Sequence, residues 1–154
     1  MNDIEAELDD FLVRYAAALT SFDAEAAASL WGSPGMLLDD HAVGVLDTQE
    51  AMVAGLEQSY PLYRRLGLTS VGHELLRLDR LSEAVFLVRV RWLFRDADGE
   101  LLTDSTGCYV LRRGGNGLLA YVYVPVDAAE KLRALAARKG VDMDAGADPG
   151  DRSS

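Results

Sequence analysis

The sequence has little cysteine, histidine or basic charge, and each shortage excludes a class of site. Cys108 is the only cysteine in 154 residues, so the chain forms no internal disulfide and a reducing, cytoplasmic compartment is expected. The two histidines, His41 and His73, lack the spacing of a zinc pair. We therefore expect no metal site and no cofactor.

Charge and hydropathy also limit the partners. The chain has 25 acidic and 15 basic residues and a net charge of −10, which disfavours nucleic acid and anionic membranes as partners. No apolar run approaches the length of a membrane span. Hydrophobic residues make up 49% of the chain, enough for one domain with a real core. We expect that domain to occupy residues 1–140, with a small, acidic, disordered tail over 141–154.

The first third of the chain shows helical spacing. Apolar residues recur along one helical face from Ile4 to Leu19, and Tyr15 lies on that face. Asn2 and Glu5 have the spacing of a capping box, which places the helix start there.

A second, alanine-rich helix follows. Asp23 is its expected N-cap, and Trp31 its last residue, because the segment 32–35 (Gly-Ser-Pro-Gly) breaks helices. Two short strands, 36–39 and 42–46, are expected next.

A third helix is expected from a capping box at Asp47 and Glu50. Pro61 lies inside its apolar pattern, which predicts a kink or an early end near Tyr60.

The apolar period then changes from helical to alternating. Four long strands are predicted over 69–79, 84–95, 101–112 and 118–124. The turns between the last three are too short for helical crossovers, so these strands pair antiparallel. A last helix over 127–139 is predicted from the Asp127 and Glu130 pair and from Gly140. The order of elements predicts an α+β fold.

Three segments carry a resemblance to a known family: RYAAAL, SFDAEAAASLW and LLDD. They resemble the nuclear transport factor 2-like superfamily, and within it the SnoaL-like and ketosteroid-isomerase branches. The resemblance covers residues 8–126. It implies a cone in which three N-terminal helices pack on a curved, antiparallel, mixed-edge sheet of about six strands, with an extra C-terminal helix and a deep apolar pocket.

The resemblance also implies roles for individual residues. Tyr15 matches the tyrosine that donates a hydrogen bond to the substrate oxygen in ketosteroid isomerases. Asp39 follows Trp31 at the spacing of their catalytic base. Their third catalytic residue, a protonated aspartate, falls near Gly107, where this chain has no acid.

The residues themselves leave two readings of this site open. Asp39 either lies in a dry pocket, where desolvation raises its pKa, or terminates a strand and caps the bend at His41. Tyr15 is either Asp39's functional partner or a core tyrosine. His73 either faces the cavity beside Asp39 or is an ordinary sheet residue. The expected catalytic residues are Asp39 and Tyr15, with His73 as a possible addition.

Aromatic residues are the expected lining of the pocket and favour a small apolar or aromatic ligand. The candidate lining residues are Trp31, Tyr60, Tyr63, Trp92, Tyr109 and Tyr121.

Two functions follow, and the sequence does not separate them. One is a cofactor-independent, isomerase- or cyclase-like enzyme that transfers a proton. The other is a non-catalytic ligand-binding or dimerisation module. A homodimer is expected through the sheet face that carries Val85, Leu87, Arg89, Arg91 and Leu93.

Overall fold

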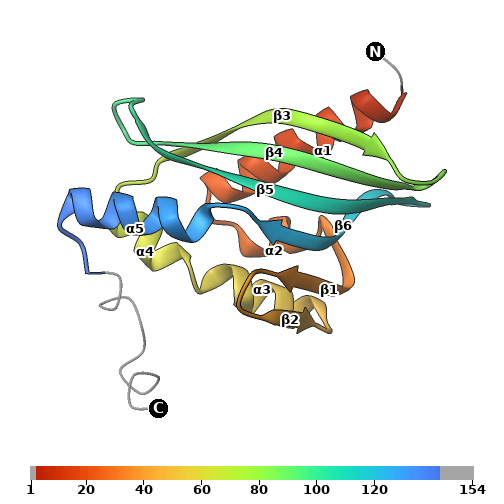
Figure 1. Cartoon of the computed structure of the whole chain (residues 1–154), viewed down its shortest axis with the longest axis horizontal. Helices are drawn as coiled ribbons and strands as arrows, with labels where there is room; N and C mark the ends of the chain where they lie inside the picture. The colour runs from red at the N-terminus through yellow and green to blue at the C-terminus, as the bar shows by residue number, and fades with distance from the viewer. Residues whose placement is uncertain (1–2, 143–154) are drawn as a thin grey trace.

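The computed structural model describes residues 3–142 (Figure 1). Its helices are α1 (Asp3–Thr20), α2 (Ala24–Ala28), α3 (Gln49–Glu57), α4 (Tyr60–Arg65) and α5 (Ala128–Lys139). Its strands are β1 (Trp31–Leu38), β2 (Val43–Leu46), β3 (Ser70–Arg80), β4 (Val85–Arg95), β5 (Leu101–Gly114) and β6 (Gly117–Pro125). The predictions for Asn2 and for the tail beyond residue 142 lie outside the described residues.

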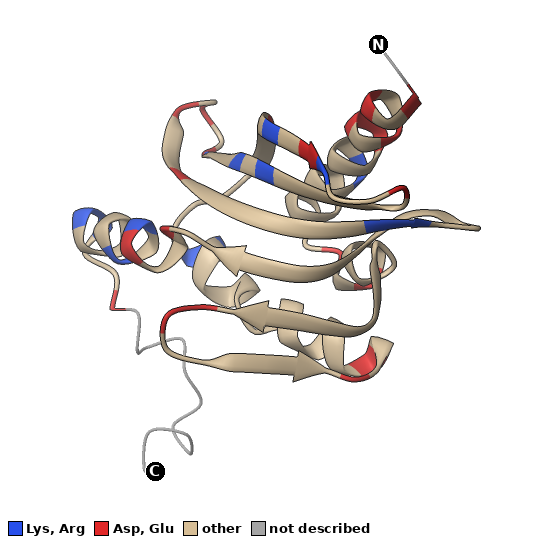
Figure 2. Ribbon diagram, turned by 45° about the vertical axis from the view of Figure 1, so that its right-hand side comes forward, with Lys and Arg blue, Asp and Glu red and all other residues tan. Residues whose placement is uncertain are grey.

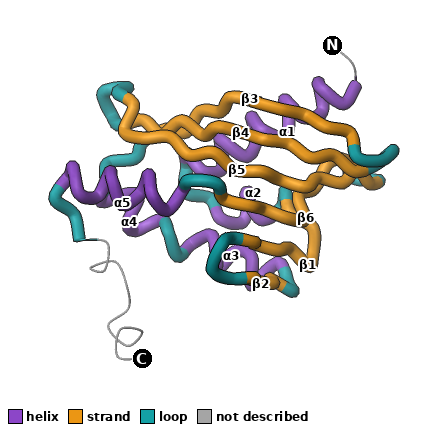
Figure 3. The backbone as a smooth tube through the Cα atoms, in the orientation of Figure 1, coloured by secondary structure: helices purple, strands orange, loops and turns teal. Residues whose placement is uncertain are grey.

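The strands form one curved sheet in the order β2-β1-β6-β5-β4-β3 (Figure 3). Neighbouring strands pair antiparallel except β1 and β6, which pair parallel. Helices α1 to α4 precede the long strands, and α5 follows them. This arrangement confirms the predicted α+β cone with about six strands and an additional C-terminal helix.

The core lies between α1 and the concave face of the sheet. On β4 the alternate residues Phe86, Val88 and Val90 are fully buried, as the two-residue period predicts. On α1 the residues Leu8 and Phe11 are buried at helical spacing against the same core. The two periods of the sequence therefore meet in one apolar interior.

Two of these three helix starts lie where the sequence predicts them, and one is shifted by one residue. Asp23 caps α2, since its Oδ1 accepts from the Ala26 amide at 3.1 Å. The N-cap of α3 is Thr48 rather than Asp47, and its hydroxyl accepts from Ala51. Asp127 occupies the N-cap position of α5, but its side chain makes no capping bond.

The predicted third helix is divided in two. Helix α3 ends at Glu57, and α4 begins at Tyr60 with Pro61 in its first turn. A proline lacks the N–H that a helix interior needs, whereas the first turn does not use it. The predicted break near Tyr60 is confirmed.

The start of β1 differs from the prediction. Trp31 does not end a helix but begins the strand, and the segment expected to be a helix stop lies inside β1. Trp31 is opposite Ala120 and Met36 is opposite Val122, so β1 bulges between these two pairs. A Cβ at Gly32 would lie 2.2 Å from the Tyr121 ring, so any larger residue in the bulge requires that ring to move.

Helix α5 covers a sheet edge that β6 leaves open. Strand β6 pairs with β5 only from Gly107 onward, which leaves the first half of β5 without a neighbour on that side. The Thr106 amide instead donates to Asp127 Oδ1 at 2.7 Å, and Arg138 donates to the Leu102 carbonyl. Lys131 Nζ also bonds Asp104 Oδ1 at 2.7 Å. These contacts satisfy an edge that would otherwise invite another chain.

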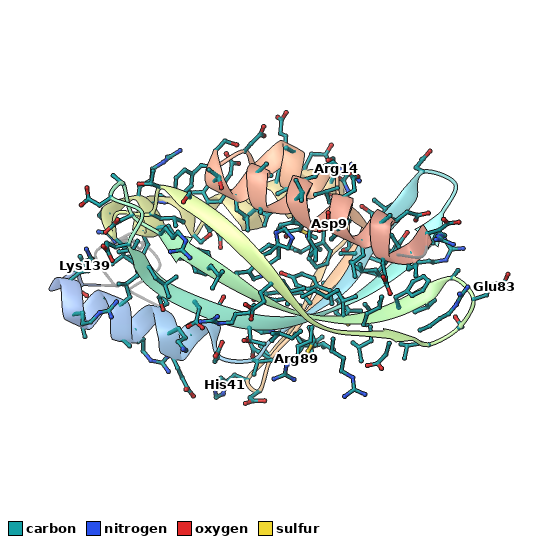
Figure 4. All side chains as sticks on the ribbon, turned by 90° about the horizontal axis from the view of Figure 1, so that it is seen from above. Asp9, Arg14, His41, Glu83, Arg89 and Lys139 are labelled. Carbon is teal, nitrogen blue, oxygen red and sulfur yellow. The ribbon has the colours of Figure 1, made fainter. Side chains whose placement is uncertain are left out.

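Among residues 3–142, the helices α1 to α4 lie on the side of the sheet opposite its convex face. Figure 4 shows Arg89 projecting from the side of the sheet opposite α1. Arg91 on the same face is paired with Asp104 on β5 and with Glu74 on β3. Val85, Leu87 and Leu93 are half-buried around them. An apolar face with fixed charges has the composition of a subunit interface.

The homodimer through this face is our first prediction. Light scattering at micromolar concentration is expected to give twice the chain mass, and Leu87→Glu is expected to give the monomer mass, because it places a charge in the interface. Val13→Glu is the control, since Val13 is exposed on α1. A monomer mass for the wild type would contradict the prediction.

Candidate ligand-binding cavity

A cavity with a volume of about 680 Å³ lies between the helices and the concave sheet face. Nine of the twelve aromatic residues of the chain line it. They are Tyr15, Phe22, Trp31, Tyr60, Tyr63, Trp92, Phe94, Tyr109 and Tyr123. Five of the six predicted lining residues, all except Tyr121, are therefore in place.

Tyr15 and Trp31 meet in the wall of this cavity. The Trp31 indole Nε1–H donates to Tyr15 Oη at 2.9 Å, and both side chains are only 4% exposed. An indole is a donor only, so the phenol accepts here and keeps its own proton for another partner. Burial raises the pKa of Tyr15 to about 12, which keeps that proton on the phenol at neutral pH.

A second indole–phenol pair lies on the sheet. Trp92 Nε1–H on β4 donates to Tyr109 Oη on β5 at 3.0 Å. Burial raises the pKa of Tyr109 well above its usual value. The Tyr109 ring stacks on Tyr123 with centroids 4.8 Å apart, which restricts its orientation. This phenol too is a hydrogen-bond donor toward the cavity.

The surroundings of Gly107 show why no acid side chain fits at this position, where ketosteroid isomerases have a protonated aspartate. It lies in the inner row of β5, two residues before Tyr109, and a Cβ there would lie 2.4 Å from Cε1 of Tyr123. The Tyr123 ring therefore occupies the space next to the backbone where a side chain of residue 107 would begin. Burial raises the pKa of Tyr123, so the group present there is a neutral phenol.

Two further hydroxyls in the cavity wall have no hydrogen-bond partner among residues 3–142. Tyr60 Oη is buried without a partner, and the side chain as a whole is 6% exposed. Ser105 is 7% exposed, lines the cavity, and its Oγ bonds to no described residue. Ser105 was missed in the sequence, although its alternation with Gly107 and Tyr109 was a usable signal.

Asp39 does not share the cavity with Tyr15, so that expectation is wrong. Its carboxylate is exposed at the turn between β1 and β2, which Figure 2 shows as acidic. Asp39 Oδ1 accepts from the amides of His41 and Ala42 at 2.8 and 2.9 Å. These bonds hold the pKa of Asp39 below its usual value, opposite to the predicted rise. The alternative reading, a cap of the bend, is the one observed.

His73 and Tyr121 also lie away from the cavity lining. His73 faces α1, with Nε2 3.8 Å from Asp9 Oδ1, and its ring lies edge-on to Trp92. Tyr121 covers the backbone of Gly32 at the β1 bulge. A bulge in β6 lies between the pairs of Ala120 and Val122, and it breaks the alternation of this strand at Tyr121.

The chemistry of the lining follows from these placements. The described residues that line the cavity include no Asp, Glu, His, Lys or Arg. Their polar groups are phenols, hydroxyls, indoles and the Gln58 amide. Within residues 3–142, no group of three or more His, Cys, Asp or Glu side chains is placed to hold a metal ion. Nor does any helix in that range have the length and apolar character to cross a membrane.

Replacing Asp39 tests its role as a cap. Because its folded-state pKa is lowered, the carboxylate stabilises the fold above its unfolded pKa, and this is lost as pH falls through the folded pKa. Asp39→Asn is therefore expected to melt below the wild type at neutral pH, with the difference fading in acid. Asp40→Asn, with the same charge change at the same exposed turn, is the control. A higher melting temperature for Asp39→Asn at neutral pH would restore the buried-acid reading.

Tyr60→Phe and Tyr15→Phe are expected to have opposite effects on stability. Removing the unpartnered Tyr60 hydroxyl is expected to raise the free energy of unfolding by about 1 kcal/mol. Tyr15→Phe leaves the Trp31 N–H without an acceptor and is expected to lower it by about 1–3 kcal/mol. Urea denaturation measures both, and a loss of stability in Tyr60→Phe would show that its hydroxyl has a partner.

Many solved structures have the same architecture. The three described here have low sequence identity to this chain. A cystatin-like-fold domain of unknown function from Nostoc punctiforme superposes with a TM-score of 0.66 at 14% identity, covering 94% of this chain and 91% of the other. Aln2 from a Streptomyces species gives 0.64 at 16% identity, covering 87% and 97%. A ketosteroid isomerase-like protein from Erwinia carotovora atroseptica gives 0.60 at 14%, covering 81% and 96%. At these identities the likeness shows the fold alone.

No functionally curated protein matches the sequence. One family model does, over residues 2–128, and it describes an NTF2-like protein family of unknown function, DUF6841. The match covers most of the chain, includes α1 to β6, and agrees with the superfamily expected from the RYAAAL, SFDAEAAASLW and LLDD segments. The chain belongs to the NTF2-like family DUF6841.

Proposed function

We propose that this protein binds a small, flat apolar or aromatic molecule in the cavity between its helices and its sheet. The observation that carries the proposal is the lining: nine aromatic residues surround about 680 Å³ that contains hydroxyl donors but no charged side chain of a described residue. Ligand pockets in proteins have this size, this apolar character and a few convergent polar groups.

The lining favours binding over proton transfer. An isomerase or cyclase of the acid–base type needs a group that gains and loses a proton near neutral pH. The phenols of the cavity have raised pKa values, and Asp39 lies outside it. Tyr15 therefore supports the proposal as a hydrogen-bond donor to a ligand oxygen, and Asp39 carries no catalytic step. The ketosteroid isomerase-like neighbour supports the cone, not the reaction.

The mouth of the cavity offers a site for blocking it. Gly55 on α3 is exposed and lines the cavity, and a Cβ there would be 3.8 Å from Leu46, an ordinary contact. Leucine at this position therefore fits the helix and fills cavity space. Both tryptophans of the chain line the cavity, so their fluorescence reports on its occupation.

We expect 2,3-dimethylnaphthalene, a flat hydrocarbon probe, to bind the wild type in calorimetry and to change its tryptophan fluorescence. Gly55→Leu is expected to weaken this binding about tenfold or more, because a filled cavity cannot admit the ligand without strain. Ala134→Leu on α5 introduces the same side chain at an exposed position outside the cavity and is the control. Unchanged affinity in Gly55→Leu would place the binding elsewhere.

A further inference from the structure

We propose that Ser105 and Tyr109 form a second polar subsite on the sheet side of the cavity, where they donate hydrogen bonds to a carbonyl-type oxygen of the ligand. This proposal rests on the proposed function and specifies its ligand class: a flat aromatic molecule that carries oxygen acceptors, such as an aromatic dione. Tyr15 approaches the same part of the cavity from α1, and its ring centroid is 6.2 Å from that of Tyr109.

Ser105 supplies the first observation. It is 93% buried, since only 7% of it is exposed, and it lines the cavity. No hydrogen bond of the described residues involves its Oγ. Because Ser105 lines the cavity and this hydroxyl has no partner among the described residues, it can donate to a ligand atom there.

Tyr109 supplies the second observation. Its oxygen accepts from Trp92 Nε1–H at 3.0 Å, and no described residue accepts the phenol's own proton. Because the indole cannot accept, Tyr109 presents a donor rather than an acceptor to the cavity. The stack on Tyr123 at 4.8 Å holds the ring in this orientation before any ligand arrives.

The strand register places the two residues in one row of the sheet. Ser105 and Tyr109 share the inner row of β5, four residues and about 13 Å apart along the strand. Ser105 is directly opposite Trp92 in the β4–β5 pairing. Tyr109 is opposite Val88, four residues from Trp92, so the bond between its Oη and the Trp92 indole spans the part of the sheet between Tyr109 and Ser105. Gly107 between them, without a side chain, leaves room for Tyr123.

The polarity of these groups selects the ligand. The Tyr15 and Tyr109 phenols each have a lone pair engaged by an indole and a proton available. No carboxylate of a described residue lines the cavity to pair with an ammonium group. A molecule with oxygen acceptors at both Tyr15 and the Ser105–Tyr109 subsite satisfies the donors, whereas an amine does not.

The test compares two probes of one shape: 2,3-dimethyl-1,4-naphthoquinone and 2,3-dimethylnaphthalene. The methyl groups of the dione occupy the ring carbons at which thiols add, so Cys108 does not interfere. Ser105→Ala is expected to weaken dione binding in calorimetry about threefold to tenfold and to leave hydrocarbon binding unchanged, because one hydrogen bond is lost. The double variant Trp92→Phe, Tyr109→Phe removes donor and acceptor together and is expected to weaken dione binding more than hydrocarbon binding.

Ser82→Ala, at an exposed serine in the turn between β3 and β4, is the control and is expected to leave both affinities unchanged. Dione affinity unchanged in Ser105→Ala would overturn the subsite, and so would an equal loss for both probes, which would mean that Ser105 only shapes the cavity. If the wild type binds the hydrocarbon but not the dione, the subsite is wrong and the proposed function stands. If it binds neither probe, both are wrong.

Discussion

The hydrogen bond from Trp31 to Tyr15 joins the first helix to the first strand inside the core, and the cavity depends on it. The two residues are 16 positions apart in the sequence, and each is only 4% exposed. Such a bond contributes about 1 kcal/mol net, but a buried N–H left unpaired costs about 1–3 kcal/mol. The pairing therefore fixes the distance between α1 and β1 and, with it, the width of the aromatic wall. It also decides that Tyr15 faces the cavity as a donor.

The inner row of β5 determines which chemistry the cavity can support. A ketosteroid isomerase-like site needs an acid near Gly107, but the Tyr123 ring lies against that glycine at a distance that excludes a Cβ. An acid introduced there would have to displace a ring that is 4.8 Å from Tyr109 and stacked on it. The Tyr123 ring therefore both lines the cavity and occupies the space that a side chain at residue 107 would need. The described lining of the cavity carries neutral phenols and hydroxyls in this region and no carboxylate.

The sequence predicted the elements well because burial on one face produces a readable period. The alternation around Trp92 and the helical stripe that carries Tyr15 each placed their residues on the core side. The predictions were wrong where backbone irregularities break the period. The bulges beside Gly32 and Tyr121 cannot be recognised from the alternation of apolar residues. The prediction for Asp39 was wrong for a different reason. Strand β1 ends at Leu38, and the Asp39 carboxylate accepts a hydrogen bond from the nearby His41 amide. Residue spacing does not show whether a carboxylate bonds the local backbone or faces a cavity.

Phe22 shows what the chain gives up for its aromatic wall. It has a φ of +53° two residues after α1 ends at Thr20, a left-handed conformation that glycine adopts freely and that costs other residues about 1–2 kcal/mol. Its ring packs edge-on against Tyr60 at 5.2 Å, and the Arg64 guanidinium lies 4.5 Å from its centroid. An aromatic pair contributes about 0.5–1.5 kcal/mol and an exposed cation–π contact about 0.5–1 kcal/mol, so the two contacts together are as large as the strain. A glycine would end the helix without strain, but it would leave the cavity without this ring.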